Sequence, residues 1–147
     1  MRTLSILFLL VACTCGLRVM ASPQRDSLRT VVEGSSTTSE RARALLVLAN
    51  ASRHTDPGES LIKVGMALRF AERTGDRALM LEAVRQQRDL ERTAGACDRF
   101  LLSAIRAVAI SQQGTDRRAT AEDLRWLGDA YERTGMFDQA VEIRKKT

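Results

Sequence analysis

Apolar residues recur every three or four positions through most of the chain after residue 37. In residues 38–54 they stand at Ala42, Leu45, Leu46, Leu48 and Ala49, with polar residues between them. This spacing places the apolar side chains on one face of a helix. The same alternation returns in each following segment of about twenty residues. The pattern predicts an all-α chain of successive amphipathic helices.

Aspartate and glycine separate these segments. An aspartate accepts hydrogen bonds from the free amide groups at a helix start, and a glycine adopts the left-handed backbone that ends many helices. The expected helix starts are Thr38 or Ser39, Asp56 with Pro57 behind it, Asp76, Asp98, Asp116 and Asp138. The helices that start at Asp56, Asp76, Asp98 and Asp116 are expected to end at Gly75, Gly95, Gly114 and Gly135.

A longer repeat groups the helices in pairs. A shift of forty residues aligns identical residues, among them Asp76 with Asp116, Glu82 with Glu122, Arg85 with Arg125, Asp89 with Asp129, and Gly95 with Gly135. A period of this length indicates that a two-helix unit is repeated and that neighbouring units stack on one another.

The last full unit carries the most specific motif. The segment "LRWLGDAYERTGMFDQAVEI" resembles a tetratricopeptide repeat in its order of large, small and turn residues. The matching positions are Leu124, Leu127, Gly128, Tyr131, Gly135, Phe137 and Ala140. In such a repeat Gly128 and Ala140 let two helices approach closely, and Phe137 closes the open end of the pair. The preceding unit departs from the motif at Arg88, where glycine is expected, and at Phe100.

The resemblance implies a right-handed stack of antiparallel helix pairs over residues 38–147, an α-solenoid of about three pairs with the last incomplete. Its inner face would be formed mainly by the first helix of each pair and would bind a protein or peptide. The expected contact residues are Arg85, Arg88, Arg125, Trp126 and Asp129. Trp126 faces away from the Leu124 seam, so we expect it to pack on the previous unit or to line a groove.

The first twenty-one residues have the pattern of an export signal. A short basic start is followed by the largely apolar "LSILFLLVACTCGL" and by small or modest residues before Ser22. We expect cleavage there, export to the periplasm or beyond the cell, and a short helix and linker over residues 22–37. The segment "LVAC" also resembles a lipobox, so a lipid anchor at Cys13 is the alternative. An uncleaved leader is a third reading.

Charge argues against nucleic acid as a partner. Arg2 and Arg18 lie in the leader, and residues 22–147 carry 21 Lys and Arg against 18 Asp and Glu. Both signs are mixed along the helices, as on a solvated face with ion pairs four residues apart. A nucleic-acid surface would need a concentrated basic patch.

Candidate catalytic residues are few. His54 is the only histidine, and Cys97 is the only cysteine after the leader. Neither has a ligand or a base at suitable spacing, and Glu122–Asp123 and Asp129–Glu132 alternate with arginines as on a solvated helix face. We therefore expect no enzyme, no cofactor and no metal site.

The sequence thus predicts a non-catalytic interaction module outside the cytoplasm. The alternative is the sensory region of a signalling protein of the tetratricopeptide-containing histidine kinase type, without its output domain. The nine residues after Asp138 are too few for a full second helix. We accordingly expect either a longer architecture or self-association at the C-terminal end.

Overall fold

The computed structural model describes residues 30, 34 and 37–147. Over this part the chain is all-α and contains no strand. The helices are α2 (Thr38–Ser52), α3 (Pro57–Thr74), α4 (Arg77–Thr93), α5 (Cys97–Ser111), α6 (Arg117–Arg133) and α7 (Phe137–Arg144). The expected leader lies outside the described residues, as do residues 22–29, 31–33 and 35–36 of the expected short helix and linker.

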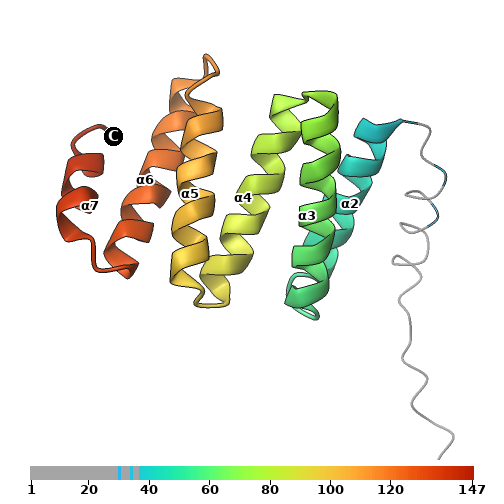
Figure 1. The fold of residues 1–147 in the computed structure, drawn as a ribbon, viewed down its shortest axis with the longest axis horizontal. Coiled ribbons are helices and arrows are strands. Elements are labelled where there is room, and N and C mark those ends of the chain that lie inside the picture. Colours follow the sequence, from blue (N-terminus) through green and yellow to red (C-terminus); the bar gives the residue numbers. More distant parts are fainter. Residues whose placement is uncertain (1–29, 31–33, 35–36) are drawn as a thin grey trace, which may run out of the picture.

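The helices stack in chain order as adjacent pairs, α2 with α3, α4 with α5 and α6 with α7 (Figure 1). Each pair also contacts the next, through α3 against α4 and α5 against α6. The predicted fold class is therefore confirmed. The last pair is the short one, since α7 has 8 residues and its partner α6 has 17.

Side chains cap most of the helix starts as the sequence predicts. The carboxylates of Asp56, Asp76 and Asp116 accept hydrogen bonds from the backbone N–H three residues on, at 2.8–3.1 Å. At the ends, Gly75 and Gly135 have φ angles of +67° and +76°. A side chain would be strained at such angles, so glycine is the residue that lets the chain reverse there.

Four predicted boundaries are wrong by one to three residues. Thr37, not Thr38 or Ser39, caps α2, and it forms a reciprocal capping box with Glu40. Asp98 and Asp138 lie in the first turns of α5 and α7, whose N-caps make no side-chain hydrogen bond. The helix predicted to end at Gly114 stops earlier, at Ser111.

The glycine turn, rather than the position of the aspartate, determines which residue is the N-cap. In three turns a left-handed glycine is followed at once by the N-cap residue of the next helix, as in Gly75–Asp76, Gly95–Ala96 and Gly135–Met136. The short turn leaves no room to delay the helix until the next aspartate arrives. The turn geometry therefore decides where α5 and α7 begin.

The core is divided between two clusters of apolar side chains. The first joins α2, α3 and α4 with Ala107 and Ile110 of α5, and the second joins α5 and α6 around Phe100. Burial of this kind is worth about 25 cal/mol per Å² of apolar surface removed from water. The stack is held together because each pair shares apolar surface with its neighbour.

The motif residues of the last unit mostly pack as expected. Leu124, Leu127 and Ala140 are buried, and Tyr131 packs against the second cluster. A Cβ atom at Gly128 would meet the Arg144 side chain at 3.7 Å, which is ordinary van der Waals contact, so α6 and α7 approach closely there. Phe137 does not close the pair, because as the first residue of α7 it projects outward and is 66% exposed.

Candidate partner-binding groove

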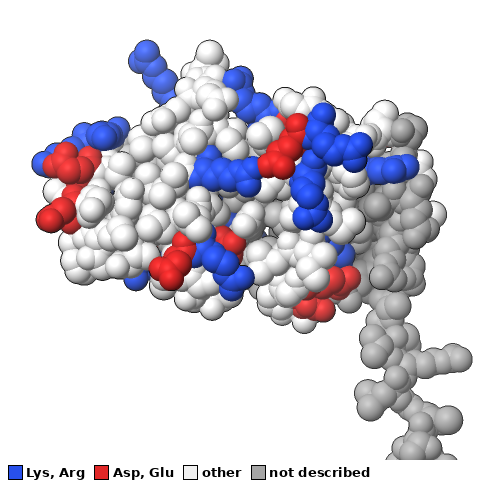
Figure 2. All heavy atoms as spheres, viewed as in Figure 1, with Lys and Arg blue, Asp and Glu red and all other residues white. Residues whose placement is uncertain are grey.

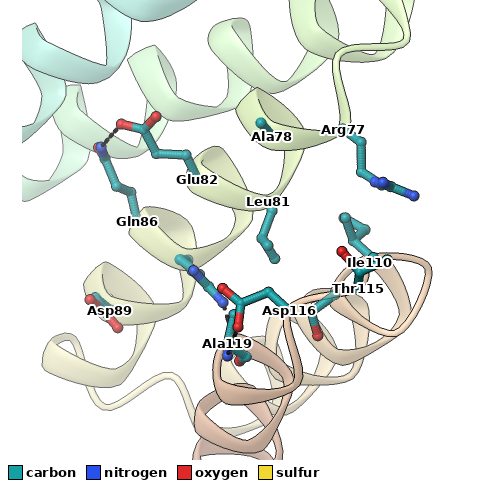
Figure 3. A pocket seen from close by; sticks show the side chains of 13 residues that line it. Arg77, Ala78, Leu81, Glu82, Gln86, Asp89, Ile110, Thr115, Asp116 and Ala119 are labelled. Carbon is teal, nitrogen blue, oxygen red and sulfur yellow. Dashed lines mark hydrogen bonds between the residues drawn. The ribbon is translucent and has the colours of Figure 1, made fainter.

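A groove runs along α4 and reaches the end of α5 and the start of α6 (Figure 3). Its volume is about 610 Å³. The lining residues are Arg77, Ala78, Leu81, Glu82, Arg85, Gln86 and Asp89 from α4, Ile110 and Ser111 from α5, Gly114 and Thr115 from the turn, and Asp116 and Ala119 at the start of α6. The first helices of the second and third pairs thus supply most of it.

Leu81 provides apolar surface among the polar residues that line the groove. Figure 3 shows Glu82, Gln86 and Asp89 following one another along α4, and Asp116 and Ala119 on the α6 side. Leu81, with Ala78, Ile110 and Ala119, provides apolar surface for a ligand, and the carboxylates lie around it. An apolar lining with a few polar groups is typical of ligand sites in proteins.

Arg85 crosses from α4 to α6. Its Nε donates to Oδ1 of Asp123 at 3.0 Å and its Nη2 donates to Oδ2 at 2.7 Å, so the two side chains form a bidentate ion pair. Nη2 also donates to the backbone carbonyl of Ala119. The hydrogen bonds to Asp123 raise the pKa of Arg85 above its ordinary value, burial opposes this, and the charges of Asp123, Glu122 and Asp116 add to it.

Arg88 completes the pairing beneath the groove. It is 4% exposed, and its Nη1 donates to Oδ1 of Asp123 at 3.1 Å. Its Nε and Nη2 both donate to Oδ1 of the neighbouring Asp89. Asp123 is itself fully buried, so Arg88 and Asp123 form a buried ion pair that depends on its own hydrogen bonds, and the partly exposed Arg85 extends this cluster to the groove.

Trp126 lies against this cluster. The guanidinium carbons of Arg88 and Arg92, both on α4, stand 4.8 and 5.2 Å from the centre of its ring, and that of Arg125 stands 5.5 Å away. Cation–π contacts of this length stabilise the pairing of an arginine with an indole. Trp126 thus packs on the previous unit, to which α4 belongs, and it is not among the residues that line the groove.

The cluster fills space between two helices that do not approach closely. Cα atoms of α2 and α4 come within 8 Å of one another, but those of α4 and α6 do not. Arg88 stands forty residues before Gly128, so a long side chain occupies the position that is small in the next unit. The side chains of Arg88 and Asp123 meet across the space between α4 and α6, and Asp123 offsets the buried charge of Arg88.

Sequence reasoning missed Asp123. Together with Glu122 it was assigned to a solvated face, and that assignment is wrong for Asp123, which is fully buried. The signal that identifies it is its position, since Asp123, Leu127 and Ala130 lie at i, i+4 and i+7 on the buried stripe of α6. A single carboxylate on such a stripe needs a partner of opposite charge.

The five expected contact residues have different positions. Arg85 lines the groove, whereas Arg88 lies beneath it and is used internally. Trp126 is half-buried beside Arg88, and Arg125 is exposed above its ring. Asp129 pairs with Arg133 one turn further along α6, at 3.1 Å. The fold thus gathers Arg85, Arg88 and Trp126 around Asp123 and leaves Asp129 outside.

A smaller hollow of about 20 Å³ continues the groove toward α2. Its lining shares Gln86 and Asp89 with the groove and adds Asn50 and Arg53 from the end of α2. The recessed surface therefore extends across the first helices of all three pairs. Elsewhere charges of both signs are interspersed, as Figure 2 shows for one face of the molecule.

His54 and Cys97 lie apart from the groove. His54 is exposed in the turn after α2, and Cys97 is the first residue of α5, with its Sγ 3.6 Å from the Gly95 carbonyl oxygen. Across residues 37–147, no group of three or more His, Cys, Asp and Glu side chains has the arrangement to hold a metal ion. No helix in the described part of the chain is long and apolar enough to cross a membrane.

Comparison with known proteins identifies no relative of this chain. No protein-family model matches the chain, and no curated protein matches it. The groove and the cluster beneath it are therefore interpreted from their own geometry.

Proposed function

We propose that this chain is a non-catalytic helical-repeat module that binds an extended segment of a partner protein outside the cytoplasm. The observation that carries the proposal is the groove of about 610 Å³ over α4, which lies on the first helices of the stack. Ligand pockets in proteins span about 300–1,000 Å³. Repeat stacks present extended recessed surfaces of this kind to their partners.

The stacking of three helix pairs supports the tetratricopeptide-like assignment within this proposal. The motif residues Leu124, Leu127 and Ala140 are buried between helices, as their roles in such a repeat require. The extracytoplasmic location rests on the export-signal pattern of the first twenty-one residues.

The groove chemistry supports binding over catalysis. Its lining includes neither His54 nor Cys97. Arg85 is fixed on Asp123, and one carboxylate oxygen of Asp116 is occupied in capping α6. A general acid or base needs a proton-transferring side chain in reach of a substrate. The groove instead offers apolar surface with fixed charges, which suits recognition of a protein segment.

The proposal is tested by selecting displayed random peptides on the full chain and measuring the binding of the enriched sequences by titration calorimetry. Ala78 is exposed and lines the groove, so Ala78→Trp fills the groove without removing a core contact. We expect it to weaken binding about ten-fold or more, a loss of at least about 1.4 kcal/mol.

The matched control is Ala109→Trp, at an exposed alanine of α5 that does not line the groove. It should leave binding unchanged. Lack of enrichment, or equal effects of the two tryptophan substitutions, would contradict the proposal. Circular dichroism of both variants confirms that each remains helical.

A further inference from the structure

The groove contains one arginine that is already neutralised. Arg85 uses Nε and Nη2 on the two oxygens of Asp123, whose side chain is fully buried. Three hydrogen bonds from its Nε and Nη2 go to Asp123 and to the Ala119 carbonyl. An acidic ligand would therefore meet an arginine whose charge Asp123 already offsets. Arg85 is therefore a poor receptor for an anion.

The carboxylates of the groove, in contrast, keep free oxygens. Glu82 receives only a long hydrogen bond of 3.5 Å from Gln86. Of the two carboxylate oxygens of Asp89, only Oδ1 accepts hydrogen bonds from Arg88. Of those of Asp116, only Oδ1 accepts from the capping N–H of Ala119. In both residues Oδ2 remains available to a ligand.

Positive charge does not balance these groups. Arg77 is the one lining cation without a carboxylate partner among the described residues, and it donates to the backbone carbonyl of Gln113 at the far end of the groove. Asp116 lines the groove, and after the hydrogen bonds to Asp123 its charge adds to the raised pKa of Arg85. Three carboxylates against two guanidinium groups therefore line the groove, and the excess of charge is negative.

We infer that the segment bound in the groove is basic, with lysine or arginine side chains on either side of an apolar one. This inference rests on the proposed function. Glu82 and Asp89 are two helical turns apart on one face of α4, roughly 10 Å along the axis at about 1.5 Å per residue. Three residues of a polyproline II segment span roughly 9 Å and return to the same side of the chain. Basic residues three apart therefore reach both carboxylates. The apolar residue beside the first of them contacts Leu81, which precedes Glu82 in α4.

The test compares three peptides with the full chain by titration calorimetry. They are acetylated and amidated forms of Ala-Lys-Leu-Ala-Lys-Leu-Ala and its analogues with glutamine or glutamate in place of lysine. We expect the lysine peptide to bind tightest and the glutamate peptide weakest. The preference should shrink as salt is raised, because salt screens exposed charges.

Substitutions of groove carboxylates then show which of them cause the preference for the lysine peptide. Glu82→Gln should weaken the lysine peptide about three-fold, and Glu82→Gln with Asp89→Asn about ten-fold, in line with exposed ion pairs. Because Asp89 also pairs with Arg88, circular dichroism of the double variant checks that the helices are preserved. Glu142→Gln on α7 removes one charge away from the groove and should change nothing.

The outcomes separate the two proposals. Equal binding of all three peptides, lost in Ala78→Trp, would overturn the basic-segment inference and leave the groove as a peptide site. Tighter binding of the glutamate peptide would overturn the inference in the same way. Enrichment of basic sequences in the displayed library would support it. Absence of any groove-dependent peptide binding would contradict the proposed function itself.

Discussion

Asp123 determines how the second and third helix pairs meet. It is a fully buried carboxylate with two arginines on it, and the arginines come from the preceding pair. Such a cluster adds little net stability compared with apolar residues of the same shape, but the loss of one member leaves a buried charge uncompensated.

Replacing Asp123 with asparagine should destabilise the protein by about 3 kcal/mol. The reason is that Arg88 stays buried after one of its two counter-charges is removed. The free energy of unfolding in urea, followed by circular dichroism, measures the effect.

The control for Asp123→Asn is Asp129→Asn, which breaks an exposed ion pair with Arg133. It should lower the free energy of unfolding by about 0.2–1 kcal/mol. The double variant Asp123→Leu with Arg88→Leu should recover much of the lost stability, because it removes both buried charges together. Equal losses for Asp123→Asn and Asp129→Asn would show that the buried cluster is not the stabilising contact described above.

Among the helices, glycine has two opposite roles. Gly65 lies inside α3, where a Cβ atom would meet open space, while Gly75 ends the same helix at a φ of +67°. Within a helix glycine costs more conformational entropy than alanine, but at a positive φ it avoids the strain that alanine would suffer.

The same substitution should therefore have opposite signs at the two positions. Gly65→Ala should stabilise the protein by about 0.5–1 kcal/mol, and Gly75→Ala should destabilise it by about 1–2 kcal/mol. Thermal unfolding checks both, with a change of roughly 4 °C in Tm for each kcal/mol. A shift in the same direction for the two variants would contradict the assigned backbone conformations.

The order and approximate extent of the helices could be predicted from the sequence, because apolar spacing and turn residues are local signals. The starts of α5 and α7 could not be, since Ala96 and Met136 take the N-cap position through the geometry of the preceding glycine turn. The groove contact of Arg85 was predicted, but its partner was not. Asp123 lies thirty-eight residues further on, and only tertiary packing brings the two together.

Across the whole molecule, stability should decline toward α7. Ala140 is the single buried residue of that helix, whereas α4 contributes six buried residues and packs against α2, α3 and α5. Short helices depend on tertiary packing, because an isolated helix of this length is unstable in water. Local opening should therefore be easiest at this end of the stack.

Amide hydrogen exchange followed by mass spectrometry tests this gradient. Peptides covering residues 137–144 should exchange fastest among the helices, and those from α4 should exchange slowest. A comparison within one sample controls for pH and temperature. Protection of α7 equal to that of α4 would indicate that the end of the stack is covered in solution.

Trp126 is the only tryptophan of the chain, and it lies beside Arg88, which holds Asp89 at the edge of the groove. Its emission therefore reports on a single interface without any added label. A cation bound by Asp89 would alter the charge next to the indole and shift the intrinsic fluorescence. Occupancy of the groove can thus be read optically from the unmodified protein.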